Sequence, residues 1–80
     1  MTKAQRGMMH AIGAKLFGED WDMTRHDLVK EVTGGRTSAS NEVLKAEAKV
    51  LLDKLAASVR ASMTPEDAAE FLANTKKAAA

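Results

Sequence analysis

The 80-residue sequence contains no cysteine, and its only aromatic residues are Phe17, Trp21 and Phe71. The absence of cysteine excludes disulfides, thiolate metal ligands and thiol nucleophiles. Of the 36 hydrophobic residues 15 are alanine, so bulky side chains that could fill a core are few. A chain of this size buries only about 60% of its unfolded surface, which leaves little material for a deep catalytic cleft. We therefore expect a single small domain with a thin margin of stability.

Long hydrophobic runs are also missing. No apolar segment approaches the roughly 18 residues that a membrane-spanning helix needs. The first residues do not have the charged, apolar and small-residue regions of a secretory signal peptide. From these two absences we expect a cytoplasmic protein that has no membrane partner.

An excess of charge of one sign is absent as well, since 12 lysines and arginines face 11 acidic residues. The charges are unevenly placed: residues 1–18 carry three basic residues and no acid, and residues 19–31 carry five acids and two basic residues. Because no basic field covers the whole chain, any contact with nucleic acid must come from a local patch. Solvated helix faces are the simpler explanation of these charges.

Helix start and stop signals, without any alternating strand pattern, predict an all-α fold. Thr2 and Gln5 have the spacing of a capping box, and Gly18 and Gly34-Gly35 suit helix ends. We expect a three-helix core with an appended fourth helix, in a single domain over residues 1–73. The predicted helices cover about 3–17, 21–33, 41–62 and 65–74, and residues 75–80 are predicted to form a frayed tail.

Helical periodicity predicts which faces are buried. In the first helix one stripe is apolar, and Lys3, Arg6 and His10 lie on the opposite side beside Gly7 and Gly13. Two interior glycines suggest that another helix, a partner or a phosphate backbone approaches this side closely. The predicted apolar stripes consist of Met8, Met9, Ile12 and Leu16 in the first helix, Trp21, Leu28 and Val32 in the second, and Leu44, Ala48, Leu51, Leu52, Leu55 and Val59 in the third. The periodicity leaves open whether Leu44 is the first buried position or belongs to the preceding loop.

Residues capable of chemistry are few. His10 and His26 have no metal-ligand spacing, and the acidic pairs at 19–20 and 66–67 stand where helix starts favour acids. The segment that begins at Gly34 lacks the spacing of a phosphate-binding loop. We therefore predict no catalytic residue, no metal site and no cofactor, and expect that the protein is not an enzyme.

Two surfaces remain as candidates for binding. The first is basic and would contact a protein partner or phosphates through Lys3, Arg6, His10, Arg36, Lys45 and Lys49. The second is hydrophobic and is centred on Phe17 and Trp21, with methionines nearby in the sequence. In so small a protein a tryptophan among methionines more often belongs to the core.

One set of residues occurs in a distinctive order: Thr2-Lys3-Ala4-Gln5-Arg6, His10-Ala11, Lys15-Leu16, Arg25, Leu28, Glu31-Val32-Thr33-Gly34, Ser38, Ala46-Glu47-Ala48, Leu51-Leu52 and Leu55. In this order residues 2–55 resemble the GemA-type regulatory proteins of Mu-like phages. A helical module at the C-terminus of some phage single-strand annealing proteins is similar. The chain departs from the family pattern at Phe17-Gly18-Glu19-Asp20-Trp21 and at Leu44, where the family tends to have a threonine cap.

The resemblance implies a phage or prophage protein that acts in the host cell on DNA transactions or transcription, through contacts rather than catalysis. The expected function is therefore a regulatory module that binds a host protein of DNA metabolism or transcription. One alternative is a dimeric DNA-binding protein that contacts phosphates through the basic stripe of the first helix. Another is a structural protein that self-associates. Both a monomer and a homodimer remain open.

Overall fold

The computed structural model describes residues 1–79 and is all-α, with no strand among them. Its helices are α1 (Lys3–Phe17), α2 (Trp21–Val32), α3 (Lys45–Ser62) and α4 (Pro65–Ala79). Two short 3-10 turns, η1 (Gly18–Asp20) and η2 (Ser40–Glu42), precede α2 and α3. The predicted fold class, three helices and a C-terminal fourth, is confirmed.

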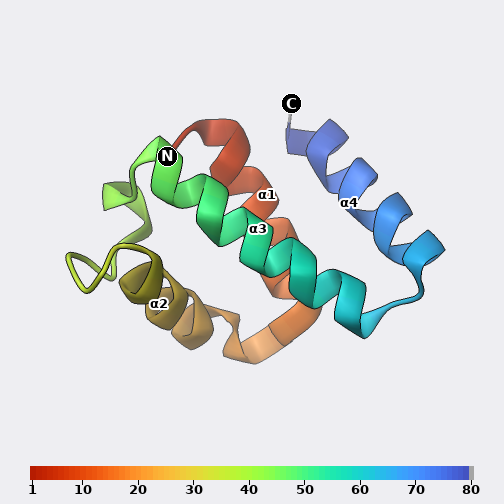
Figure 1. Cartoon of the computed structure of the whole chain (residues 1–80), viewed down its shortest axis with the longest axis horizontal. Helices are drawn as coiled ribbons and strands as arrows, with labels where there is room; N and C mark the ends of the chain where they lie inside the picture. Colours follow the sequence, from red (N-terminus) through yellow and green to blue (C-terminus); the bar gives the residue numbers. More distant parts are fainter. Residues whose placement is uncertain (80) are drawn as a thin grey trace.

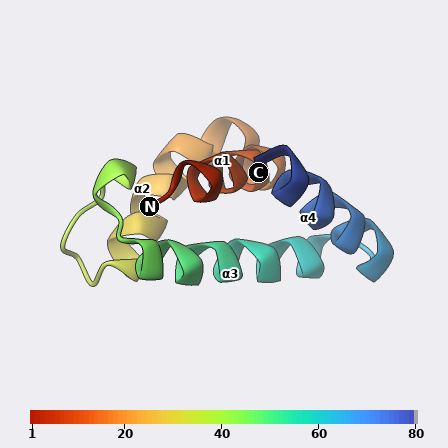
Figure 2. The ribbon, with the colours of Figure 1, turned by 90° about the horizontal axis from the view of Figure 1, so that it is seen from above.

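The helices form two layers, with α3 in front of α1 in Figure 1 and the two layers seen apart in Figure 2. After η1 the chain turns back, so that α2 runs alongside α1 in the opposite direction. Seen from above, α3 lies beneath α1 and α2, and α4 closes one end (Figure 2). Helix α4 packs mainly against α1 and less against α3. Since α1 also packs against α2 and α3, it contacts every other helix. The first helix is thus the centre of the fold.

The core lies between these layers and follows most of the predicted stripes. Met9 and Ile12 of α1 are fully buried, and Met8 and Leu16 are partly buried beside them. In α2 the fully buried residue is Val29, and the predicted Leu28 and Val32 flank it. The buried hydrophobic residues are Met9, Ile12, Trp21, Val29, Val43, Ala48, Leu51, Leu55, Val59 and Ala68.

The start of α3 differs from the prediction. The helix begins at Lys45 rather than near residue 41, and Leu44 is its N-cap with 60% of its surface exposed. Val43, which is 2% exposed, takes the buried place that the periodicity assigned to Leu44. The backbone of Leu44 is extended, so it leaves the helical period, and its side chain points away from the core. Leu44 therefore belongs to the connection and not to the apolar stripe.

The predicted frayed tail was wrong for the residues that the structure describes. Helix α4 continues past residue 74 to Ala79, and residue 80 lies outside the described range. Thr75 is buried, and its hydroxyl donates a hydrogen bond of 2.9 Å to the Leu72 carbonyl oxygen. The burial of Thr75 shows that this turn of α4 packs against the rest of the fold, which opposes fraying at that position.

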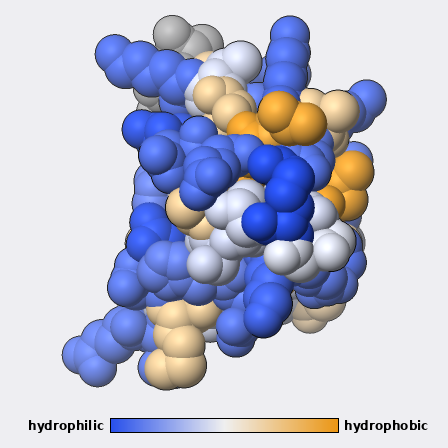
Figure 3. Space-filling view, turned by 90° about the vertical axis from the view of Figure 1, so that its left-hand side faces the viewer, coloured by the Kyte–Doolittle hydropathy of each residue, from blue (hydrophilic) through white to orange (hydrophobic). Residues whose placement is uncertain are grey.

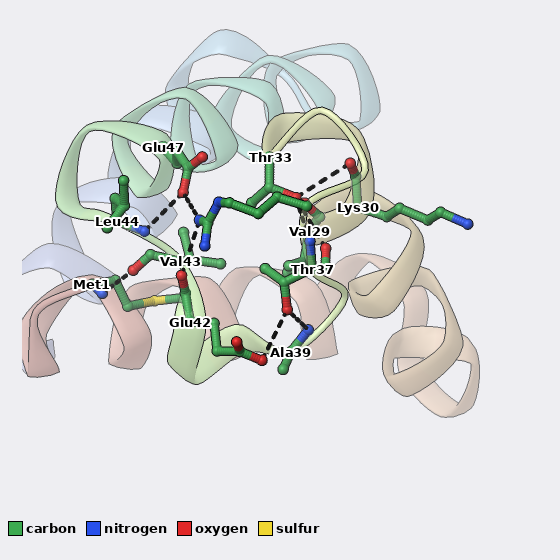
Figure 4. Close-up of polar contacts among 11 residues, drawn as sticks. Met1, Val29, Lys30, Thr33, Thr37, Ala39, Glu42, Val43, Leu44 and Glu47 are labelled. Carbon is green, nitrogen blue, oxygen red and sulfur yellow. Dashed lines mark hydrogen bonds and ion pairs between the residues drawn. The ribbon is translucent and has the colours of Figure 1, made fainter.

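The connection between α2 and α3 is held by side chains (Figure 4). Gly34 and Gly35 have φ angles of 65° and 85°, so the predicted glycine stop of the second helix is confirmed. The buried Thr33 hydroxyl lies 2.8 Å from the Val29 carbonyl oxygen and 2.9 Å from that of Thr37, and its single proton can be donated to either. It also accepts a bond from the Thr37 N–H, so one hydroxyl links the end of α2 to the loop.

Candidate binding surface

Gly13 and Trp21 form the closest contact between α1 and the start of α2. A Cβ atom placed on Gly13 would lie 2.2 Å from Cε2 of the Trp21 indole. Gly13 is itself buried, so the indole rests directly on the α1 backbone. The close approach predicted from the glycines of the first helix is therefore made, at Gly13, by a side chain of the same chain. It is not left open for a phosphate backbone.

Trp21 belongs to the core, which corrects the proposal of an exposed hydrophobic surface at Phe17 and Trp21. Trp21 is only 8% exposed. Its indole ring stacks on the Phe17 ring, with ring centroids 6.0 Å apart and ring planes 8° apart. Phe17 is half-buried beside it. Because the two rings cover each other, neither presents a free face as large as a binding anchor requires.

His10 is tied to Trp21 by a hydrogen bond. The indole Nε1–H donates to Nδ1 of His10 over 3.2 Å, and the two rings meet edge to face at 6.2 Å. An Nδ1 that accepts a bond carries no proton, so the neutral ring holds its proton on Nε2. This bond also satisfies the one polar atom of the buried indole. The contact requires His10 to be neutral.

Two arginines lie near this histidine. Arg6 precedes His10 by one helical turn on α1, and Arg25 follows Trp21 by one turn on α2. The hydrogen bond between Trp21 and His10 joins these parts of α1 and α2, and both arginines act on the charge of His10. Partial burial lowers the pKa of His10, and repulsion by Arg25 and then Arg6 lowers it further, whereas Asp22 raises it. We call Arg6, His10 and Arg25 the arginine–histidine cluster.

Arg25 is the member of this cluster that the sequence analysis did not propose as a binding residue. Its guanidinium forms an ion pair with the exposed Asp22, and its side chain is 21% exposed. The Arg25 Nε atom is buried and has no hydrogen-bond partner. The available signal was the four-residue spacing of Trp21 and Arg25, which matches that of Arg6 and His10. It could be interpreted only once the pairing of the two helices was known.

The remaining predicted basic residues do not all join this cluster. Arg36 forms an ion pair with Glu47 and donates to the Glu42 carbonyl oxygen, so it serves the connection between α2 and α3. Its pairing with Glu47 places Arg36 in the connection between α2 and α3, away from the cluster, and its role in binding stays a prediction. Lys3, Lys45 and Lys49 are exposed.

The starts of α1 and α3 lie side by side. Gln5 Nε2 donates a bond of 3.2 Å to the Lys45 carbonyl oxygen, and the Met1 nitrogen donates to the Val43 carbonyl oxygen. Figure 3 views the end of the molecule that carries the α2–α3 connection, and its surface is mainly hydrophilic with small, separate hydrophobic areas. This end presents no large hydrophobic area for docking.

A shallow groove of about 580 Å³ lies at the other end of α1, where the chain passes from α3 to α4. The lining residues are Lys15, Ser62, Met63, Thr64, Asp67, Glu70, Phe71 and Asn74. Within residues 1–79 no three histidine or acidic side chains converge in a way that could hold a metal ion. The groove is broad and open, and it brings together no nucleophile with a base.

None of the helices that the structure describes combines the length and the apolar character needed to cross a membrane. Comparison with protein-family models, with curated proteins and with solved structures finds no match to this chain. The surfaces of the molecule therefore have to be interpreted from their own chemistry.

Proposed function

We propose that the protein is a non-enzymatic regulatory module that binds an acidic surface of a host protein of DNA metabolism or transcription. The binding face comprises Lys3, Arg6 and His10 of α1, extended by Arg25 of α2. The observation that carries the proposal is the hydrogen bond between Trp21 and His10, with the indole resting against Gly13. It joins the part of α1 that carries Arg6 to the part of α2 that carries Arg25. Guanidinium groups are well suited to carboxylate recognition.

Two further features support this proposal. The resemblance of residues 2–55 to GemA-type regulatory proteins suggests a phage protein that acts through contacts. The basic face is also small, because the acidic residues Asp22, Asp27 and Glu31 of α2 lie close to Arg25 in the sequence. These acids disfavour a long nucleic-acid backbone, which binds through several phosphate contacts, but they leave room for a compact acidic site on a protein.

The experiment is capture from bacterial lysate with the parent protein and two charge reversals. Arg6→Glu changes the proposed face. Arg60→Glu makes the same change in an exposed residue near the end of α3, about 22 Å along that helix from Lys45. We expect a protein retained by the parent and by Arg60→Glu but lost by Arg6→Glu, and the same order of affinities when that partner is purified.

Three results would contradict the proposal: no retained protein, equal retention by both variants, or retention that disappears after nuclease treatment. The last result would favour the DNA-binding alternative. In that case the logarithm of the affinity should fall linearly with the logarithm of the salt concentration, because phosphate contacts release counterions.

A further inference from the structure

Beside His10, the structure leaves hydrogen-bond donors of Arg25 unused. A guanidinium has five N–H donors, and the Asp22 ion pair engages only Nη2, whereas Nε is buried and out of reach of a ligand. Asp22 is 78% exposed, so its pairing with Arg25 is in contact with water and is readily exchanged. A carboxylate from outside could therefore bind Arg25 in addition to Asp22 or in its place.

The charged groups that act on His10 come from α1 and α2 alone among the described residues: Arg6, Arg25 and Asp22. Two of the three are cations, and the ring is kept neutral while its Nδ1 accepts the indole N–H. An anion seated between the arginines would reverse this balance, because it offsets their repulsion of an imidazolium. Occupation of the site and the charge of His10 are thus linked.

We propose that Arg6, His10 and Arg25 form a binding site for a carboxylate of an acidic protein segment, and that its occupation is coupled to proton uptake by His10. The inference rests on the proposed function and specifies its ligand and its regulation. A proton on Nδ1 removes the acceptor of the Trp21 N–H, so binding also loosens the contact between His10 and Trp21. Affinity then rises as the pH falls, and the single tryptophan reports the event.

An acidic protein segment fits this site better than a nucleic-acid strand. The site offers two guanidinium groups within a helix pair that also carries Asp22, Asp27 and Glu31. One or two carboxylates satisfy the arginines in the fork geometry that guanidinium prefers. A strand of regularly spaced phosphates would place its next charges against the acids of α2.

The test follows the imidazole protons of the full chain by NMR over a pH titration, without ligand and with a hexaglutamate peptide. We expect the peptide to raise the pKa of His10. Tryptophan fluorescence should show binding about fivefold or more tighter at about pH 5.5 than at about pH 8.

Variants separate a role in the site from a role in folding. His10→Asn offers an oxygen near the position of Nδ1 but has no titrating ring, so the difference in affinity between about pH 5.5 and about pH 8 should disappear. Arg25→Gln should weaken binding, and Arg60→Gln, which removes an exposed charge elsewhere, should not. Circular dichroism checks that each variant remains helical.

Several outcomes would overturn the inference. A His10 titration that is the same with and without the peptide excludes the site, even if Arg6→Glu loses the lysate partner and the proposed function stands. If oligothymidine raises the pKa of His10 more than the peptide does, an acidic protein segment is excluded as the ligand. Conversely, the peptide could raise the pKa of His10 while the lysate yields no retained protein. That result would support the binding site and contradict the proposed function.

Discussion

The indole of Trp21 occupies the space that a side chain at Gly13 would need. A Cβ atom there would approach three carbons of the ring within 2.2 to 2.4 Å. The glycine therefore lies inside a helix not because of an unusual backbone angle but because α1 and the start of α2 must meet without a side chain between them. This contact places His10 and Arg6 opposite Trp21 and Arg25.

Gly13→Ala should destabilise the protein, although alanine is the better helix former by about 1 kcal/mol. The added methyl group forces the buried indole to move, and overpacking of this kind costs about 1–3 kcal/mol or more. The measurement is urea unfolding followed by circular dichroism. Gly7→Ala is the matched control, since Gly7 is exposed in the same helix.

For Gly7→Ala we expect a gain of about 1 kcal/mol from helix propensity alone. The two substitutions of the same type should thus act with opposite sign. Stabilisation by both would show that Trp21 is not held against the α1 backbone.

Leu44→Ser should stabilise the protein. Leu44 is the N-cap of α3, its φ and ψ of −74° and 158° suit a cap, and a leucine has no acceptor for the free N–H groups of the first turn. Only the reciprocal half of a capping box is present, in which the Leu44 N–H donates to Glu47 over 2.9 Å. A serine hydroxyl would supply the missing half, worth about 1 kcal/mol.

That gain corresponds to a rise in Tm of about 4–8 °C for a domain of this size, measured by thermal unfolding. Leu44→Ala tests the alternative that removal of an exposed leucine is itself stabilising. An equal rise in Tm for the alanine and serine variants would contradict the capping argument.

Those features of the fold that depend on neighbours in the sequence could be predicted. The Thr2 and Gln5 capping box, the glycine stop of α2 and the stripe that includes Leu51 and Leu55 are all local patterns, and the structure contains each of them. Each is decided within one or two helical turns, so the residue types alone determine it.

What could not be predicted depends on pairs that lie far apart in the chain. The position of Arg25 beside His10, and the capture of Arg36 by Glu47, follow from how helices pair and not from any periodicity. The burial of Thr75 likewise requires the packing of α4, so a polar, alanine-rich end was interpreted as frayed. For the candidate site, the roles of Arg6, His10 and Arg36 in binding therefore stay predictions, and of the two positions proposed for Trp21 the structure contains the buried one.

Thr33→Val should destabilise the connection between α2 and α3. Valine keeps the shape of threonine but removes the hydroxyl that bonds Val29 and Thr37. Because Thr33 is buried, the freed groups lose a partner at a cost of about 1–3 kcal/mol. Hydrogen exchange should show faster exchange of the Thr37 amide. Thr33→Ser retains the hydroxyl and should retain most of the protection, and equal loss in both variants would assign the effect to the methyl group.

The stability of the ligand-free protein should fall as the pH drops below neutrality. Partial burial, Arg25 and Arg6 together lower the pKa of His10 in the folded state below the ordinary value of 6.5. The unfolded chain then takes up a proton more readily than the folded one, so the contribution of His10 to stability is complete above about pH 6.5. It is lost progressively as the pH falls from there through the folded pKa.

The measurement is the urea midpoint at several pH values between about 7.5 and 5.5, a range above the titration of ordinary carboxylates. In His10→Asn the acceptor for the Trp21 N–H is kept without a titrating group, so its midpoint should vary less over the same range. An equally steep pH dependence in the parent and in His10→Asn would show that the histidine does not control it.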